Sequence, residues 1–126
     1  MFEYIMGELT VKKVDYIALD INGLAYKIFI SLKTYEALDE VGVDQKVYIH
    51  TNVKEDDISF YGFKSENERE LFKALVSISG VGPKLALAIL STYNTKDVID
   101  IVLDANVKLL TKVPGLGDKK KKKLIL

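Results

Sequence analysis

The first half of the chain alternates apolar and polar residues with a period of two. Ile17, Leu19 and Ile21 alternate with small or more polar neighbours, which is typical of a strand with one buried face. The pair Asn22-Gly23 follows at once, and Asn-Gly is the strongest short hairpin signal because both positions tolerate positive φ. Similar segments predict further strands over residues 4–11, 24–30, 46–52 and 58–63, with a helix over 31–40.

Five short strands at the start of the chain predict a small closed barrel, for which the OB-fold is the common solution. From Ser65 the period lengthens. Ser65 and Glu68 have capping-box spacing, and an apolar face follows at helical spacing. Further helices are predicted over 83–91, 95–103, 106–112 and 118–126. The predicted fold class is α+β, with an OB-fold barrel over residues 1–63 and an all-α domain over 64–126.

An internal repeat at an offset of 35 residues is the most informative feature of the second half. Residues 78–84 match residues 113–119, and Leu75 matches Leu110. Each copy reads as a helix, a Gly-apolar-Gly turn and a second helix with an early lysine. The sequence therefore predicts two helix-hairpin-helix motifs.

The chemistry of such a turn suits a phosphate. The first glycine permits a tight turn, and the second leaves the backbone bare where a helix begins, so that free N–H groups and the helix dipole can meet an anion. Nothing in this arrangement reads a base, so binding of a nucleic acid through such a phosphate is predicted to ignore sequence. The alternative is a plain tight turn, which the duplication disfavours. The candidate phosphate-binding residues are Gly80, Val81, Gly82, Lys84, Gly115, Leu116, Gly117, Lys119 and Lys120.

Charge is distributed unevenly, although the chain has 18 basic and 18 acidic residues. Residues 1–63 hold 6 Lys and 11 Asp or Glu, a net of −5, whereas residues 64–126 hold 12 Lys or Arg and 7 Asp or Glu, a net of +5. The basic half is where an anionic partner would dock. The lysine run 119–123 also fits a solvated tail, because five consecutive side chains cannot share one helix face.

In combination, these motifs resemble the RuvA family along the whole chain. The resemblance lies in segments 71–90 and 112–117, in 4–9 and 19–26, and in 53–56 followed by 61–63. It implies a subunit without its own active site that binds four-way (Holliday) DNA junctions as a homotetramer, with one or two tetramers per junction. A RuvB-type hexameric ATPase then drives branch migration, and a RuvC-type resolvase belongs to the full system.

The resemblance also implies an acidic pin at the crossover, carried onto Glu55 and Asp56. Without it, the segment around these residues would be interpreted as a polar hairpin tip. The family's C-terminal RuvB-binding domain has no counterpart up to Leu126, so no RuvB contact is expected from this chain; a fragment and a short natural form both remain open. In the second copy Lys121 stands where the first has Ala86, and Asp118 where it has Pro83, so we expect the second hairpin to be the weaker one.

Other classes find little support. No cofactor is expected, because no Gly-rich loop ends in Gly-Lys-Ser/Thr. A metal site is not expected either, since His50 is the single histidine, and Asp97, Asp100 and Asp104 fit a solvated helix face. The absence of cysteine, of an apolar run of roughly 20 residues and of a signal peptide indicates the cytoplasm and no membrane partner.

Two rival functions stay open. A nuclease or glycosylase also uses helix-hairpin-helix motifs as a DNA grip, but it needs an added catalytic domain. A single-strand binder would use the barrel and its tyrosines, although the net charge of −5 on residues 1–63 argues against it.

Overall fold

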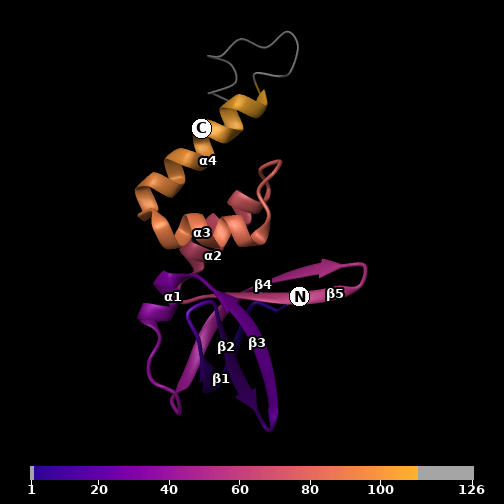
Figure 1. Cartoon of the computed structure of the whole chain (residues 1–126), viewed down its shortest axis with the longest axis vertical. Coiled ribbons are helices and arrows are strands. Elements are labelled where there is room, and N and C mark those ends of the chain that lie inside the picture. The colour runs from indigo at the N-terminus through magenta and orange to yellow at the C-terminus, as the bar shows by residue number, and fades with distance from the viewer. Residues whose placement is uncertain (1, 111–126) are drawn as a thin grey trace.

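The computed structural model describes residues 2–110, which form a barrel with helices stacked above one end of it (Figure 1). The five strands close in the order β1-β2-β3-β5-β4. This is the predicted OB-like barrel, and it confirms the α+β class. The strands are β1 (Tyr4–Lys12), β2 (Tyr16–Ile21), β3 (Leu24–Ile30), β4 (Asp44–Lys54) and β5 (Asp57–Phe63).

Local signals set the hairpins as predicted. Asn22 and Gly23 both have positive φ, 53° and 90°, and they join β2 to β3 with Ile21 paired to Leu24. The barrel closes through a parallel pairing of β3 with β5, from Ile28 opposite Phe60 to Ile30 opposite Gly62. Inward-facing aliphatic side chains then fill the barrel: Ile5, Leu9, Ile17, Leu19, Ile28, Ile30, Leu38, Val47 and Ile49.

The helices are α1 (Leu32–Ala37), α2 (Glu66–Val76), α3 (Pro83–Thr92) and α4 (Thr95–Leu110). The α1 helix is shorter than the predicted 31–40. Two helices were predicted where α4 is continuous. The segment 95–110 contains neither glycine nor proline, so nothing in its local sequence interrupts the helix. The side chain of Asn94 caps α4, because the Asp97 N–H donates to Asn94 Oδ1 at 2.9 Å.

A second hydrophobic cluster joins the helices to the barrel. It consists of Tyr61, Phe63, Phe72, Leu75, Ala86, Leu90 and Val98. The Phe72 ring of α2 lies at its centre, 5.1 Å from the Tyr61 ring and 5.0 Å from the Phe63 ring of β5. The boundary proposed near residue 63 therefore separates two kinds of secondary structure, while the hydrophobic packing continues across it.

Hydrogen bonds also tie α2 to the barrel. Ser65 caps α2, accepting from the Glu68 N–H at 3.1 Å, as the capping box predicts. A capping box also predicts that the Glu68 carboxylate accepts from the Ser65 N–H. This part of the prediction is wrong, because the carboxylate accepts hydrogen bonds from another element. It accepts from the Thr34 hydroxyl of α1 at 2.7 Å, and the Ser31 hydroxyl lies 3.3 Å from the same oxygen. A hydrogen bond between α1 and α2 has replaced a local one.

Within residues 2–110, no helix is long and apolar enough to cross a membrane.

Candidate nucleic-acid interface

The turn between α2 and α3 has the geometry of a helix-hairpin-helix motif. After α2, the Ile78 N–H donates to the Leu75 carbonyl at 3.1 Å, and the Val81 N–H donates to the Ile78 carbonyl at 3.0 Å. Between them Gly80 has φ +89°, a conformation that side chains oppose. Gly80 is therefore the residue whose lack of a side chain lets the chain reverse.

Val81 points back into the protein. Its side chain is half-buried and packs against the second hydrophobic cluster, as does Ile78. The apolar residue of the turn therefore packs against the helix pair. The two glycines on either side of Val81 remain exposed, so the turn presents backbone to solvent.

Gly82 is the N-cap residue of α3, and the fold does not demand a glycine there. Its φ of −88° and ψ of 174° suit any residue, and a Cβ added to it would meet nothing within 4 Å. It provides no side-chain cap, and Pro83 follows at the first helical position. The N–H groups of Lys84 and Leu85 in the first turn of α3 have no intrahelical acceptor. A bare, uncapped and solvent-facing helix start is the result.

Lys84 is exposed on this first turn, as a phosphate-closing lysine must be. It also borders a groove between α3 and the barrel that holds Asp15 and the apolar side chains of Val14 and Leu87. The counterpart residues of the second hairpin, Gly115, Leu116, Gly117, Lys119 and Lys120, lie outside the described residues.

Glu55 and Asp56 form the tip of a long hairpin. Lys54 at the end of β4 pairs with Asp57 at the start of β5, so these two acidic residues make up the whole turn. Both are exposed. In the view of Figure 1 the β4–β5 hairpin extends away from the barrel, toward the same side as the α2–α3 turn. The structure brings the two acidic residues together at an outlying position.

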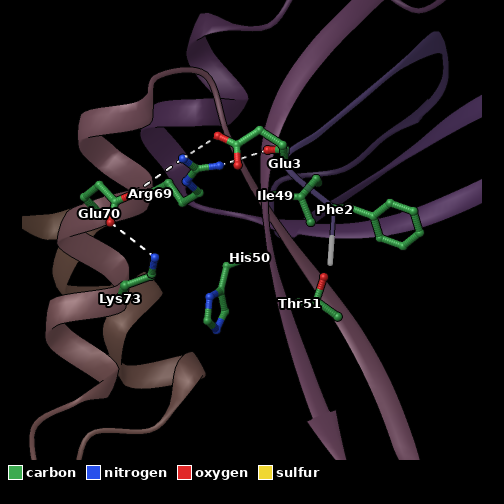
Figure 2. Close-up of a pocket in the computed structure, with 8 residues that line it drawn as sticks. All are labelled: Phe2, Glu3, Ile49, His50, Thr51, Arg69, Glu70 and Lys73. Carbon is green, nitrogen blue, oxygen red and sulfur yellow. Dashed lines mark hydrogen bonds and ion pairs between the residues drawn. The ribbon is translucent and has the colours of Figure 1, made fainter.

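The sequence reasoning missed a polar pocket between β4 and α2. Figure 2 shows it, lined by Phe2, Glu3, Ile49, His50, Thr51, Arg69, Glu70 and Lys73. Arg69 is only 8% exposed. Its guanidinium donates to the Glu3 carbonyl and to the Glu3 carboxylate, both at 2.9 Å. A signal was available, since Arg69 lies three residues before Phe72 on the buried face of α2.

The surroundings in this pocket shift the pKa values of two of its residues. The hydrogen bond to Glu3 is the main reason why the pKa of Arg69 is raised above its usual value. The pKa of His50 is lowered from 6.5, first by burial and then by the nearby charges of Lys73 and Arg69. The His50 ring packs edge-on against Phe72 at 5.3 Å, so this histidine is a packing residue at the interface between barrel and helices.

Within the part of the chain that the structure describes, no group of three or more His, Cys, Asp or Glu side chains could hold a metal ion. The three aspartates of α4, Asp97, Asp100 and Asp104, are exposed, which agrees with a solvated face.

The fold and the site define a class of protein, in which an OB-like barrel packs on helices that carry a helix-hairpin-helix turn. Residues 1–62 match the family model of the RuvA N-terminal domain, and residues 72–126 match a SAM-like helix-hairpin-helix tandem. The second match supports the presence of a second hairpin copy. The first of these matches places the N-terminal half of the chain with the RuvA family.

Relatives with the name "Holliday junction branch migration complex subunit RuvA" align over all 126 residues. The one from Fusobacterium nucleatum is 43% identical, and the chain covers 64% of its length. The one from Geobacter sp. strain M21 is 40% identical with 63% covered, and that from Acetivibrio thermocellus is 42% identical with 62% covered. The chain thus spans less than two thirds of the length of these relatives.

Proposed function

We propose that this protein binds four-way DNA junctions through their sugar–phosphate backbones, regardless of sequence, and holds them open for branch migration during recombination and repair. The observation that carries the proposal is the start of α3. There the positive φ of Gly80 and the bare N-cap at Gly82 leave the first-turn N–H groups facing solvent.

A phosphate fits this place for two reasons. Unpaired N–H groups and the positive end of the helix dipole both favour an anion, and Lys84 adds a full charge on the same turn. Each such contact reads the backbone and no base. The two-domain division, 1–63 for the barrel with its pin and 64–126 for the paired hairpins, then assigns phosphate binding to the basic half of the chain.

The acidic tip at Glu55 and Asp56 supplies the preference for a junction. Carboxylates facing phosphates repel them, by roughly 4 kcal/mol for two charges about 4 Å apart at an effective dielectric near 20. An uninterrupted duplex would have to carry its phosphates past this tip. An open crossover offers a gap in which the tip can stand, so the strands keep to separate paths.

The names of the relatives describe a subunit of a branch migration complex, and this supports the proposal that the protein works in an assembly with partners. We infer a homotetramer around the junction, four pins toward its centre, working with a RuvB-type ATPase and a RuvC-type resolvase. In this proposal the chain has no active site of its own, and the ATPase performs the hydrolysis.

A competition experiment tests the proposal. A labelled four-way junction bound to the protein is challenged with unlabelled junction, duplex of the same sequences, or poly-dT. We expect the junction to compete far better than either, and affinity to fall steeply with salt because phosphate contacts release counterions. Light scattering with and without the junction measures the assembly. Better competition by poly-dT would instead make the protein a single-strand binder, and strand cleavage or base release by purified protein would make it an enzyme.

A further inference from the structure

An exposed apolar pair lies immediately behind the acidic tip. Val53 of β4 and Ile58 of β5 are directly opposite each other in the ladder. Val53 is 55% exposed and Ile58 is 60% exposed. They line a shallow hollow together with the four tip residues between them. Two β-branched apolar side chains facing water at one spot call for an explanation.

The alternation of the strands explains how they come to be there. Ile49, Thr51 and Val53 share one face of β4, and Ile49 is buried in the barrel. However, β1 pairs with β4 only as far as Tyr48, and β3 pairs with β5 only from Phe60 onward. Beyond these points the hairpin is a two-stranded ribbon. Val53 and Ile58 thus continue the inward face of the barrel past the place where the barrel ends.

The charges around this pair select its occupant. The tip from Lys54 to Asp57 carries three carboxylates and one ammonium group, so it repels phosphates. The apolar pair neither attracts nor repels phosphates. The partner must therefore keep its phosphates away from the tip and bring a flat, uncharged surface to the apolar pair. A DNA base pair that has lost a stacking neighbour meets both conditions. Such base pairs occur where duplex arms meet, and proteins use apolar side chains to unstack base steps.

We propose that Val53 and Ile58 form an apolar wedge that packs against the base pairs at the crossover, while the acidic tip keeps the phosphates apart. This rests on the proposed function. The acidic tip then repels the strands from the centre of the junction, and the wedge stabilises the opened base pairs. Specificity for a junction comes from both together, since a continuous duplex offers no exposed base-pair face.

The test replaces both side chains by threonine, Val53→Thr with Ile58→Thr. Threonine keeps the β-branch and the strand preference, and the two positions are exposed, so the fold should persist. The matched control is Val41→Thr. Val41 is 56% exposed and precedes the first residue of β4, far along the strand from the acidic tip. The junction carries 2-aminopurine at the crossover base pairs, whose fluorescence rises on unstacking.

We expect wild type and Val41→Thr to raise the fluorescence alike. The double variant should lose most of that rise and bind the junction about tenfold more weakly, since replacing two apolar contacts costs on the order of one power of ten in affinity. Its duplex affinity should stay the same. Wild-type fluorescence and affinity in the double variant would overturn the wedge, as would an equal loss in Val41→Thr.

Two further outcomes are distinguishable. If wild type itself shows no preference for a junction over a duplex, the proposed function fails, and the wedge fails with it. If the double variant changes the mass of the free protein by light scattering yet keeps the fluorescence rise, the pair is a self-association surface and the wedge alone is overturned.

Discussion

The start of α3 allows fold and DNA binding to be separated by one substitution, Gly82→Asp. The backbone at Gly82 has φ −88° and ψ 174°, and nothing lies within 4 Å of an added Cβ. Aspartate is among the best N-cap residues and favours the positive end of the helix dipole. The substitution should therefore leave the free energy of unfolding unchanged or raise it by about 0.5 kcal/mol, a few tenths being the usual difference between a glycine and a side-chain cap.

The same substitution should abolish phosphate binding at this hairpin. The new carboxylate would occupy the first-turn N–H groups and stand where a phosphate is proposed. Two like charges about 4 Å apart cost roughly 4 kcal/mol at an effective dielectric near 20, and salt reduces this. We expect the dissociation constant for a four-way junction to rise at least about a hundredfold, which corresponds to roughly 2.8 kcal/mol.

Fluorescence anisotropy with labelled junction measures binding, and thermal unfolding by circular dichroism measures stability. Gly82→Asn is the matched control, because it caps the helix without a charge and should weaken binding by only about tenfold, the worth of one lost hydrogen bond to a charged group. Gly80→Ala is the backbone control. At φ +89° it should cost about 1–2 kcal/mol, as left-handed backbone does for a residue with a side chain. A Gly82→Asp protein that binds within a few-fold of wild type would refute the phosphate site.

Four further predictions concern other residues. Lys84→Glu should weaken binding to all DNA sequences by a similar factor and lower the salt slope by about one; a sequence-dependent loss in anisotropy titrations would contradict backbone contact. Glu55→Gln with Asp56→Asn should raise affinity for plain duplex and reduce the preference for a junction, so an unchanged duplex affinity would speak against the pin. Arg69→Met should lower the free energy of unfolding in urea by about 1–3 kcal/mol, since it removes two hydrogen bonds to Glu3. The control Glu3→Gln keeps the main-chain carbonyl and one side-chain oxygen as acceptors, so it should lower the free energy of unfolding by less. An equal loss in both variants would contradict this prediction. Because the pKa of His50 is lowered in the fold, the unfolded chain binds the proton more readily, so the contribution of His50 to stability is full above pH 6.5 and declines as the pH falls below it. His50→Gln should flatten that decline in unfolding curves taken between about pH 7.5 and pH 5.5. An unchanged decline in the variant would assign it to other groups.

The sequence alone determined the features that depend on neighbouring residues. Alternation with a period of two predicted the strands, Asn22-Gly23 predicted the turn with positive φ, and the spacing of Gly80 and Gly82 predicted the bend between α2 and α3. Each of these is decided within a few residues, by which backbone angles a residue tolerates and which side of the strand or helix it occupies. The resemblance to the RuvA family rested on such local segments and is confirmed.

Only the tertiary structure decided the contacts between distant segments. Arg69 reaches Glu3 across 66 positions, and Glu68 bonds Thr34 across 34. Both depend on how the closed barrel presents its N-terminus and α1 to α2. The exposure of Val53 and Ile58 is of the same kind. Their alternation resembles that of a buried strand, and only the point at which β1 and β3 stop pairing leaves them in water. Local patterns state which face a side chain occupies, whereas closure of the barrel determines what that face meets.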